Sequence, residues 1–501
     1  MVKRILNMDI LKSHGNIKAR EIALDLLETG LCACDPYANT AKLVRLEGET
    51  LRVGHPEFEL KGDPVTGDSV FDLREIDRIF IFGWGKGIQR VTKAIEDILG
   101  ERVSGGHVVC KHGDEIIMER VGVTCGGHPV PDADCVEGNG RIVEICENAA
   151  FTERDLVITA ACSGVSALMT LPVDEVPLED VCELTRIMQI DLGVPTHDLN
   201  MIRSHLDRLK GGRINRYFGR AKLVHIAAHD MNITSKGDGV NAYNNILHHN
   251  NWLHTFPDSR YFSDAWAVVQ KWEVEDKLPK SAIAYLKKAP PEDESMKAEE
   301  FVKLGARCFG TMPKDKGPVW ATAERAKELG FRPYVLVRKF DTEPAPVAFF
   351  TGNMALLSIA ENQPFKPPCV LISTGESIVS VGQGGKVGGR NQEYALSGAL
   401  AIAGNKRIAM ASCDTDGTDG PGGNFDQTAW DNGVRCLCGG IVDGYTLEEA
   451  NERGVDIFSA IRRHDTSQAL WRLDSGAHAV QTLSLDDLHI CVIMDEDGER
   501  A

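Results

Sequence analysis

Short apolar runs that lead directly into glycine-rich loops and then into amphipathic helices constrain this chain more than any other feature. One unit begins with residues 77–82, continues through Gly83-Trp-Gly-Lys-Gly87, and then has apolar residues at 88, 91, 95 and 98, the spacing of a helix. A second unit runs from 155–161 into Cys162-Ser-Gly-Val-Ser166. Further strands are predicted at 222–228, 333–337, 369–373, 407–412 and 489–494. The alternation predicts an α/β fold with mainly parallel strands and ligand loops at their carboxyl ends.

The chain is too long for one hydrophobic core. Its 501 residues predict two or three domains. The periodic pattern weakens between 230 and 317, which is first rich in asparagine and histidine and then charged. We therefore expect an N-terminal Rossmann-like domain over residues 1–258, which holds the first glycine-rich loops, and a C-terminal α/β domain over residues 259–501.

The charge balance excludes some partners. The chain has 55 basic and 73 acidic residues and a net charge of −18, which argues against a broad surface for nucleic acid or an anionic membrane. Neither an uninterrupted apolar segment of about 18 residues nor a secretory leader is evident. Fourteen cysteines are scattered singly instead of at metal-ligand spacing. We expect a cytoplasmic protein with buried thiols.

The loop at 83–87 is a candidate anion site. Because it joins a strand to a helix, backbone N–H groups around Gly85 and the helix dipole can hold an anion, with Lys86 beside it. The loop lacks the four-residue spacer of a Walker A motif, and Ile88 replaces the last glycine of a dinucleotide fingerprint. A tight structural turn is the alternative interpretation.

The loop after the strand at 155–161 is a second candidate. Ser163, Gly164 and Ser166 offer hydroxyls and N–H groups that can cradle a phosphate. The run resembles the hydrolase elbow G-x-S-x-G but fails at Leu168. The start of a capped helix is the alternative.

A basic cluster forms a third candidate. A helix predicted over 196–210 carries Arg203 and Lys210 seven residues apart on one face, with Arg208 and Arg213 nearby. In a chain this acidic, the cluster favours recognition of an anion such as a carboxylate. The alternative is that the cations complement the helix C-terminus.

A glycine-rich segment in the C-terminal half places polar side chains at the start of a helix. Arg390, Asn391 and Glu393 follow the glycines of 384–389. An arginine in such a position can grip a carboxylate bidentately or spread the charge of a phosphoryl group. A surface hairpin is the alternative.

The most acidic loop that follows a strand is Asp414-Thr-Asp-Gly-Thr-Asp419. The side chains of Asp414, Asp416 and Asp419 could hold Mg²⁺ through water or supply a general base. An Asx-rich turn is the alternative. His248, His249 and His254 show no metal-ligand spacing, so we interpret them as polar loop residues.

The order of these motifs resembles one known family. The chain reads G-x-G-K-G, G-G-H-P-V-P-D, S-G-x-S-A-L, N-x-x-R-x-H-L-x-x-x-K-G-G-R, G-G-R-N-Q-E and D-T-D-G-T-D-G-P. This succession is similar to the glycerate 2-kinase family with a MOFRL-type C-terminal domain. The resemblance spans nearly the whole chain apart from 231–315.

The resemblance implies a kinase that uses ATP and Mg²⁺ and acts on the 2-hydroxyl of D-glycerate or a related small hydroxy acid. It implies two α/β domains with mainly parallel, doubly wound, Rossmann-like sheets and an active-site cleft between them. The implied partners are a small hydroxy acid, a nucleotide and, in a homodimer, a second copy of the chain.

The resemblance also implies roles for individual residues. The implied catalytic residues are Lys86, Arg390 and Asp416. The implied ligands of substrate and phosphate are Gly85, Ser163, Gly164, Ser166, Arg203, Lys210, Asn391 and Glu393. The implied metal ligands are Asp230, Asp414 and Asp419.

Two segments depart from the family pattern. Cys162, Ser163 and Val165 replace a serine and two glycines, and a β-branched Val165 is sterically awkward where backbone must approach phosphate. In the second segment, His229-Asp-Met-Asn-Ile-Thr replaces S-D-V-x-G-D, and Leu253-His-Thr255 replaces G-P-T. The altered loop leaves open a non-catalytic or altered-specificity small-molecule-binding descendant. Gly83-x-Gly85 on a strand–helix turn leaves open a hydroxypyruvate reductase.

Overall fold

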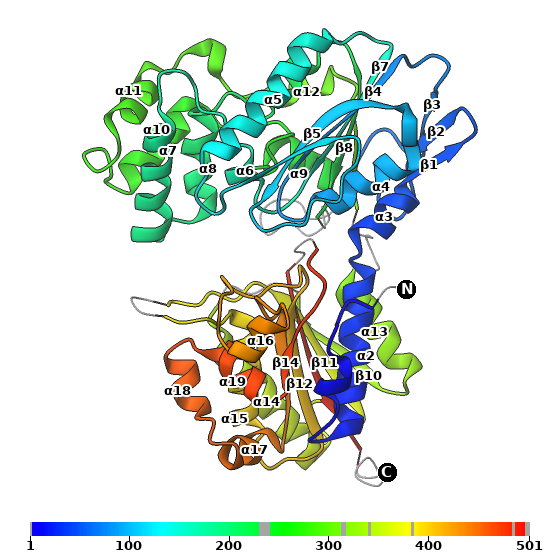
Figure 1. Ribbon diagram of the computed structural model, residues 1–501, viewed down its shortest axis with the longest axis vertical. Coiled ribbons are helices and arrows are strands. Elements are labelled where there is room, and N and C mark those ends of the chain that lie inside the picture. The colour runs from blue at the N-terminus through cyan, green and yellow to red at the C-terminus, as the bar shows by residue number, and fades with distance from the viewer. Residues whose placement is uncertain are drawn as a thin grey trace. The chain divides into compact units, whose positions relative to one another are not determined.

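The computed structural model of the chain forms two compact units (Figure 1). It describes residues 3–229, 241–311, 317–338, 342–381, 385–482 and 486–495. Unit 1 combines residues 1–35 with 315–501, and unit 2 comprises residues 36–314. The predicted α/β class is confirmed, because each unit contains a six-stranded sheet with helices packed on it. No helix among the described residues has the length and apolar character needed to cross a membrane.

The main sheet of unit 2 is parallel throughout. In spatial order its strands are β6 (Gly122–Gly126), β5 (Val103–Lys111), β4 (Arg78–Trp84), β7 (Asp155–Ala161), β8 (Lys222–Ala227) and β9 (Arg307–Gly310). The central strands β4 and β7 are almost entirely buried, as expected for parallel strands covered on both faces. In chain order, β5 and β6 are added on one side of β4, and β7, β8 and β9 are then added on its other side. The topological switch point, where ligands bind in doubly wound sheets, therefore lies between β4 and β7.

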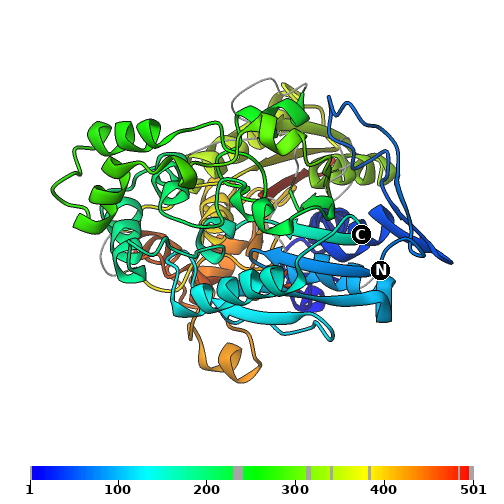
Figure 2. The same cartoon turned by 90° about the horizontal axis from the view of Figure 1, so that it is seen from above.

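Helices cover this sheet and form a separate cluster at one end of it. The helices of unit 2 are α3 (Pro36–Leu43), α4 (Gln89–Leu99), α5 (Ala133–Ala149), α6 (Val165–Leu168), α7 (Leu178–Thr185), α8 (Thr196–His205), α9 (Ala242–His248), α10 (Phe262–Lys271), α11 (Lys280–Lys288) and α12 (Ala298–Val302). Figures 1 and 2 both show the green helices α10 and α11 gathered to one side of the unit 2 sheet. With α7 and α8 they enclose an apolar core of their own. A small antiparallel sheet adds β1 (Val44–Glu47), β2 (Thr50–Val53) and β3 (Ser69–Asp72).

The sheet of unit 1 differs from the predicted mainly parallel arrangement. In spatial order it contains β10 (Arg332–Val337), β11 (Cys369–Gly375), β15 (Asp487–Ile493), β12 (Ile408–Asp414), β13 (Gly439–Asp443) and β14 (Gly476–Ala477). Strands β10 and β11 are parallel, and the other neighbours run antiparallel. Two of the antiparallel pairs arise because β15 inserts between β11 and β12 in the opposite direction, and the other two arise because β13 runs opposite to β12 and β14. The start of β15 therefore lies at the same sheet edge as the ends of β11 and β12.

Helices pack on both faces of the unit 1 sheet. One face contacts α2 (Ile17–Ala33) and α13 (Pro318–Glu328), which lie side by side in Figure 1. The opposite face contacts α14 (Pro344–Glu361), α15 (Arg390–Ala401) and shorter helices that follow them in the chain. The shorter helices are α16 (Gln427–Asp431), α17 (Thr446–Glu452), α18 (Ile457–Arg462) and α19 (Thr466–Arg472), and α1 (Met8–Leu11) precedes α2.

The chain divides at positions other than the predicted 258/259. Residues 1–35 belong with the C-terminal half because α2 buries Ala23, Leu27 and Leu31 in the core of the unit 1 sheet. Residues 259–314 belong with the N-terminal half because α10 and α11 join its helical cluster and β9 completes its sheet. The weak pattern after position 230 thus marks helices within unit 2 instead of a junction.

A buried ion pair joins the N-terminal segment to unit 1. The Arg20 Nε atom of α2 lies 2.5 Å from Asp443 Oδ2 at the end of β13, and both side chains have an exposed fraction of 0%. Arg20 also donates to the Leu11 carbonyl (2.9 Å). Asp443 accepts further hydrogen bonds from the N–H groups of Asn16 and Tyr445.

We predict that Arg20→Met lowers the stability of unit 1 by about 3–5 kcal/mol, since it leaves Asp443 charged and unpaired in the interior. Urea unfolding and hydrogen exchange of the α2 amides measure the loss. The matched control is Arg325→Met, which removes an ion pair to Asp25 that also links α2 to unit 1 but is more than one-third exposed on both side chains. It should change stability by only about 0–1 kcal/mol. Equal effects of the two substitutions would contradict the prediction.

Candidate functional site

Two of the predicted loops lie next to each other at the switch point of unit 2. The backbone N–H of Lys86, after β4, donates to the carbonyl of Ser163, after β7 (2.8 Å). The N–H of Cys162 donates to the carbonyl of Trp84 (3.1 Å). These bonds continue the β4–β7 pairing beyond the strands, so the two loops form one connected surface.

Two glycines in these loops are required by the close approach of the chain. Gly85 has φ of +135°, and a Cβ atom there would lie 2.2 Å from the sulfur of Cys162. Gly164 has φ of +87°, and its Cβ would lie 2.8 Å from Cγ of Lys86. Both values are below any normal contact, so neither position accepts a side chain without displacement. Val165, by contrast, is fully buried in the unit 2 core, so its branched side chain is directed away from the loop surface.

The charges of three cations act on His128, which lies near these loops. His128 lies within the G-G-H-P-V-P-D motif, and a Cβ on Gly164 would be 3.2 Å from its ring. Burial, followed by the positive charges of Lys86, Lys111 and Arg203, lowers the pKa of His128 to about 3. Lys111 is the last residue of β5, the strand next to β4. The imidazole is therefore neutral at physiological pH, and the surrounding charge is positive.

Ser166 is hydrogen-bonded to a buried histidine. Its Oγ lies 3.0 Å from Nε2 of His254. Burial, followed by the charges of Lys210 and Arg203, holds the pKa of His254 well below its usual range. His254 is thus a neutral buried partner of Ser166 instead of the polar loop residue that we expected. The departure from G-P-T at 253–255 was the sequence signal for it.

Arg203 and Lys210 have different surroundings. Helix α8 ends at His205 instead of continuing to Lys210, because the Asp207 carboxylate accepts the N–H groups of Leu209 and Lys210. Lys210 Nζ donates to Met169 O (2.9 Å), Thr170 Oγ1 (2.9 Å) and Asp207 Oδ2 (2.5 Å). All three donors of this ammonium group are used, so Lys210 holds the fold together and is not available to bind a ligand directly.

Arg203 is buried but is hydrogen-bonded to a neutral group. Its Nε and Nη2 donate to Asn200 Oδ1 at 3.2 and 2.8 Å. Burial lowers the pKa of Arg203 to about 10, and the nearby Asp207 opposes that change. The guanidinium is therefore charged at pH 7, and no carboxylate of the described residues is hydrogen-bonded to it. Of the predicted basic cluster, Arg203 is the better candidate to bind an anion.

In unit 1, Arg390 begins α15 and is held by two carboxylates. Its Nε donates to Asp487 Oδ1 and its Nη2 to Asp414 Oδ2, each at 2.9 Å. Glu376, after β11, lies 3.5 Å from Nη2. Burial opposes the charge of Arg390, but Asp487 and Asp414 outweigh it and raise the pKa. The guanidinium is thus permanently charged and rigidly oriented at the edge where β11, β12 and β15 meet.

Asp487 is the functional candidate that sequence reasoning missed. It pairs with Asp414 across β12 and β15 and also accepts a hydrogen bond from Asn391 Nδ2 (2.7 Å). Burial raises the pKa of Asp487, and Arg390 opposes this rise. No local pattern marks Asp487, since its contacts arise only when the last strand inserts between β11 and β12.

Asp419 and Glu393 are committed to contacts within unit 1. Asp419 Oδ2 accepts the backbone N–H of Gln392 (2.9 Å), and Asp419 Oδ1 accepts from Asn391 Nδ2 (3.3 Å). Asp419 thus satisfies the first turn of α15, and burial raises its pKa against the opposing hydrogen bond from Gln392. Glu393 is paired with His464. Burial raises the pKa of Glu393, and His464 opposes it.

Of the predicted metal ligands, Asp414 and Asp419 are the two that the structure describes. Within the described residues, His112, Asp132 and Asp134 bring possible metal-ligand atoms within 4.8 Å of one another. Asp414, Asp416 and Asp419 do not form such a group. Asp416 Oδ1 accepts from the N–H and hydroxyl of Thr418 (2.7 and 2.8 Å). Asp230 lies outside the described residues. The acidic loop is therefore not a cage of three carboxylates for a metal.

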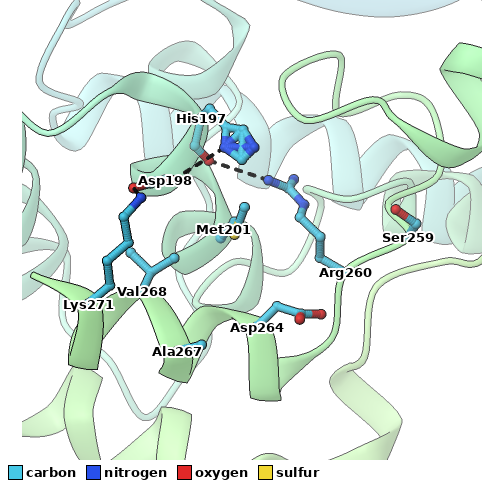
Figure 3. A pocket seen from close by; sticks show the side chains of 9 residues that line it. All are labelled: His197, Asp198, Met201, Ser259, Arg260, Asp264, Ala267, Val268 and Lys271. Atoms are coloured by element: carbon cyan, nitrogen blue, oxygen red, sulfur yellow. Dashed lines mark hydrogen bonds and ion pairs between the residues drawn. The ribbon is translucent and has the colours of Figure 1, made fainter. Parts of the chain in front are cut away.

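A pocket of about 500 Å³ lies between α8 and α10, in the helical cluster (Figure 3). Its charged residues are largely neutralised within the protein: Lys271 lies 2.6 Å from Asp198, and Arg260 pairs with Asp258. None of the predicted site residues lines it.

Comparison with known proteins identifies the class of this chain. A family described as a domain of unknown function (DUF4147) matches residues 22–238, and the MOFRL family matches residues 369–484. A glycerate 2-kinase of Pyrococcus horikoshii is 29% identical over 90% of this chain and 92% of its own length. A D-glycerate 2-kinase of Thermotoga maritima is 30% identical over 79% of this chain and 85% of its own length.

A solved structure agrees with these matches. The crystal structure of a Pyrococcus horikoshii protein superposes with a TM-score of 0.69 at 26% identity, covering 95% of this chain and 99% of that one. The fold and the relatives define a phosphotransferase with an alcohol group as acceptor. Within that class, the chain belongs to the glycerate 2-kinase family.

We predict that His254→Gln flattens the acid side of the stability profile. An unfolded histidine has a pKa of about 6.5, whereas the folded pKa of His254 is far lower. Above pH 6.5 neither state binds the proton. As the pH falls below it, the unfolded chain gains a proton that the folded chain excludes, and wild-type stability is lost by on the order of 1 kcal/mol per pH unit.

Glutamine retains a hydrogen-bonding group for Ser166 but does not titrate. Urea unfolding of both proteins between pH 5 and pH 8 measures the slopes. Parallel profiles for His254→Gln and wild type would contradict the prediction, because they would show that folded and unfolded His254 take up the proton over the same pH range.

Proposed function

We propose that this chain transfers the γ-phosphoryl group of ATP to the 2-hydroxyl of glycerate. The observation that carries the proposal is the meeting of the loops after β4 and β7 at the unit 2 switch point, where Lys86 and His128 both lie against Gly164 and the charges of Lys111 and Arg203 act on the same neutral imidazole. This positive charge suits a small anion with a carboxylate or phosphate, even though the whole chain carries a charge of −18. The acceptor in this proposal, glycerate, is inferred from the relatives that are named glycerate 2-kinases.

In unit 2, the proposed roles follow from what each group already contacts. Arg203 carries a full charge beside the neutral amide of Asn200, so it is assigned to the substrate carboxylate. Lys86 is assigned to the phosphoryl group in transfer. The loop of Ser163, Gly164 and Ser166, bonded to Lys86 through the backbone, is assigned to phosphate oxygens.

In unit 1, the proposed roles use the polar edge of the sheet. Arg390 is held by Asp414 and Asp487, so its orientation is preset for stabilising phosphoryl charge. Asp416 is assigned as the acceptor of the hydroxyl proton, because Asp414 and Asp419 are occupied by Arg390 and by the start of α15. Asn391 and Glu393 act in this proposal as supports of α15.

ATP and Mg²⁺ remain part of the proposal. The separated carboxylates do not suit a metal bound by protein alone. Mg²⁺ in kinases instead is bound by substrate phosphates together with one or two carboxylates, and it neutralises the charge that develops in transfer. The fourteen free thiols, most of them buried, support a reducing cytoplasm as the site of action.

The test is an assay of ADP release from ATP and Mg²⁺ with D-glycerate and a panel of small hydroxy acids. We expect turnover that depends on the acid. In the product, phosphorus-31 NMR should show coupling to the single C2 proton instead of the two C3 protons. Nucleotide binding by calorimetry without turnover of any acid would favour the non-catalytic descendant and overturn the proposal. Oxidation of NAD(P)H with hydroxypyruvate would favour the reductase.

We predict that Lys86→Met lowers kcat by about 10²-fold or more, the usual effect of removing one group that stabilises transition-state charge. Steady-state kinetics measures the change. Lys303→Met, at an exposed position of unit 2, is the matched control and should leave kcat unchanged. An unaltered rate in Lys86→Met would remove this lysine from the mechanism.

We predict that Arg390→Lys lowers kcat by about 10-fold or more although it conserves the charge, because a lysine cannot form the fork that spans Asp414 and Asp487. Kinetics at saturating substrate, with a circular dichroism check of folding, measures the effect. Activity at the wild-type level would show that charge alone suffices at this position.

A further inference from the structure

Two cysteines face each other across the last strand pair of the unit 2 sheet. Cys110 on β5 and Cys125 on β6 are register partners, and their sulfur atoms lie 3.5 Å apart. Neighbouring strands are about 4.8 Å apart, which falls within the Cα separations of ~4.4–6.8 Å that a disulfide spans. The two sulfurs therefore need to approach each other by only ~1.5 Å to reach the S–S bond length of about 2.05 Å.

The two sulfurs differ in their access to a small oxidant. Cys110 is fully buried, whereas Cys125 is partly exposed on β6, the strand at the edge of the sheet. Burial, followed by the negative charges of Cys125 and Asp114, raises the pKa of the Cys110 thiol. Cys110 is thus a neutral thiol at physiological pH, so Cys125 is the sulfur that reacts with an oxidant first.

The pair lies at the ends of strands that lead into the candidate site of unit 2. Cys110 is followed directly by Lys111, and Cys125 lies three residues before His128. The charge of Lys111 acts on the His128 imidazole, so the segments that follow the two cysteines meet in the site. A covalent bond between the sulfurs changes the spacing of the strands just before these two residues.

A hydrogen bond connects the same pair to the loop that carries Lys86. The side-chain amide of Gln89, the first residue of α4, donates to Cys110 Sγ (3.3 Å) and to the carbonyl of Glu115 (3.0 Å). Gln89 is buried and lies three residues after Lys86. When the Cys110 sulfur moves towards Cys125, it moves away from Gln89, and the start of α4 loses one of its contacts.

We propose that Cys110 and Cys125 are a redox modification site, a thiol pair that hydrogen peroxide converts into an intramolecular disulfide, and that this bridge lowers the proposed kinase activity. The loss of activity rests on the proposed function, whereas the formation of the bridge does not. Cytosolic disulfides are usually transient and redox-sensing, and strained ones are readily reduced. Thiol reductants therefore restore the pair.

The chemistry takes two steps and consumes one molecule of peroxide. The Cys125 sulfur attacks one oxygen of hydrogen peroxide, the O–O bond breaks, and a sulfenic acid and water are formed. The Cys110 sulfur then attacks the Cys125 sulfur: the S–S bond forms, the S–O bond breaks, and the leaving hydroxide takes the Cys110 proton to become a second water. The two sulfurs lose two electrons, which reduce the peroxide. Because the sulfenic acid is neutral, the first step also removes the Cys125 charge that opposes ionisation of Cys110.

Peptide mapping of the full chain after treatment with a small excess of hydrogen peroxide tests the bridge. After alkylation of the remaining thiols, trypsin leaves Cys110 in the peptide 103–111 and Cys125 in the peptide 121–141. We expect these two peptides to be joined, and dithiothreitol to separate them. Fragment ions distinguish Cys125 from Cys135, which lies in the same peptide.

Two results of the mapping would overturn the proposal. One is Cys125 oxidised to a sulfinic acid while Cys110 is still alkylated, which would show that the buried thiol does not reach its partner. The other is Cys125 joined to a different cysteine, in the same copy or in a second one.

The effect on activity is tested with a matched pair of variants, Cys125→Ser and Cys182→Ser, which each replace a partly exposed cysteine of unit 2. Each is compared with its own untreated sample in the assay of acid-dependent ADP release. Because a misplacement of about 1 Å near reacting groups can cost about 10²-fold, we expect peroxide to lower kcat/KM by about tenfold or more in wild type and in Cys182→Ser. Cys125→Ser should resist, and dithiothreitol should restore the other two. Equal losses in all three proteins, or a bridged wild type of unchanged kcat/KM, would overturn the effect on activity.

Hydrogen exchange measures the effect of the bridge without turnover, so it separates this proposal from the proposed function. We expect the amides in the first turn of α4 to exchange about tenfold faster in peroxide-treated wild type than in peroxide-treated Cys125→Ser, because the bond from Gln89 to Cys110 is lost. A chain that turns over no acid before oxidation contradicts the proposed function alone. Equal exchange at α4 in the bridged and unbridged proteins would overturn the connection between the cysteine pair and the Lys86 loop.

Discussion

The pairing of β4 with β7 is the contact on which the candidate site of unit 2 depends. Both strands are buried at the centre of a parallel sheet, and their hydrogen bonding continues into the loops that follow them. Because the Lys86 N–H donates to the Ser163 carbonyl, the loop that carries Lys86 and the loop that carries Ser163 are held at a fixed distance from each other. The close approach leaves no room for a side chain at Gly85 or Gly164. A strand shift of one residue would separate these groups and disperse the positive charge.

The partners of the buried cations distinguish structural from functional roles. Arg20 and Lys210 each pair with a buried carboxylate and are hydrogen-bonded to neighbouring chain segments, so their charge is neutralised where it lies. Arg203 is bonded to an amide, which orients the guanidinium without cancelling its charge. Arg390 is held by two carboxylates at a sheet edge that three strands share. In an acidic chain, a cation whose hydrogen-bond partner is neutral is the one that attracts an anion.

The sequence predicted what local periodicity controls. Strand–loop–helix units such as 77–98 and 155–168 appeared where expected, because apolar runs and glycines specify them locally. Their loops could be placed together from the rule for parallel strands. The end of α8 could not be predicted, since the contacts of Asp207 decide it. Asp487 was missed because its neighbours are more than 70 positions away in the chain. The strand order of unit 1 and the association of residues 1–35 with it likewise depend on non-local packing.

Unit 2 occupies one continuous stretch of chain, whereas unit 1 is built from two stretches that lie on either side of it. This arrangement gives the two units different opportunities during synthesis. Unit 2 has all its residues once position 314 has left the ribosome, and it can fold as a unit while the remainder is being made. Helix α2 is synthesised before unit 2, whereas its core partners on β12 and β15 are synthesised after it. The apolar face of α2 therefore stays uncovered while the whole of unit 2 is made, so α2 is the segment most in need of protection by chaperones.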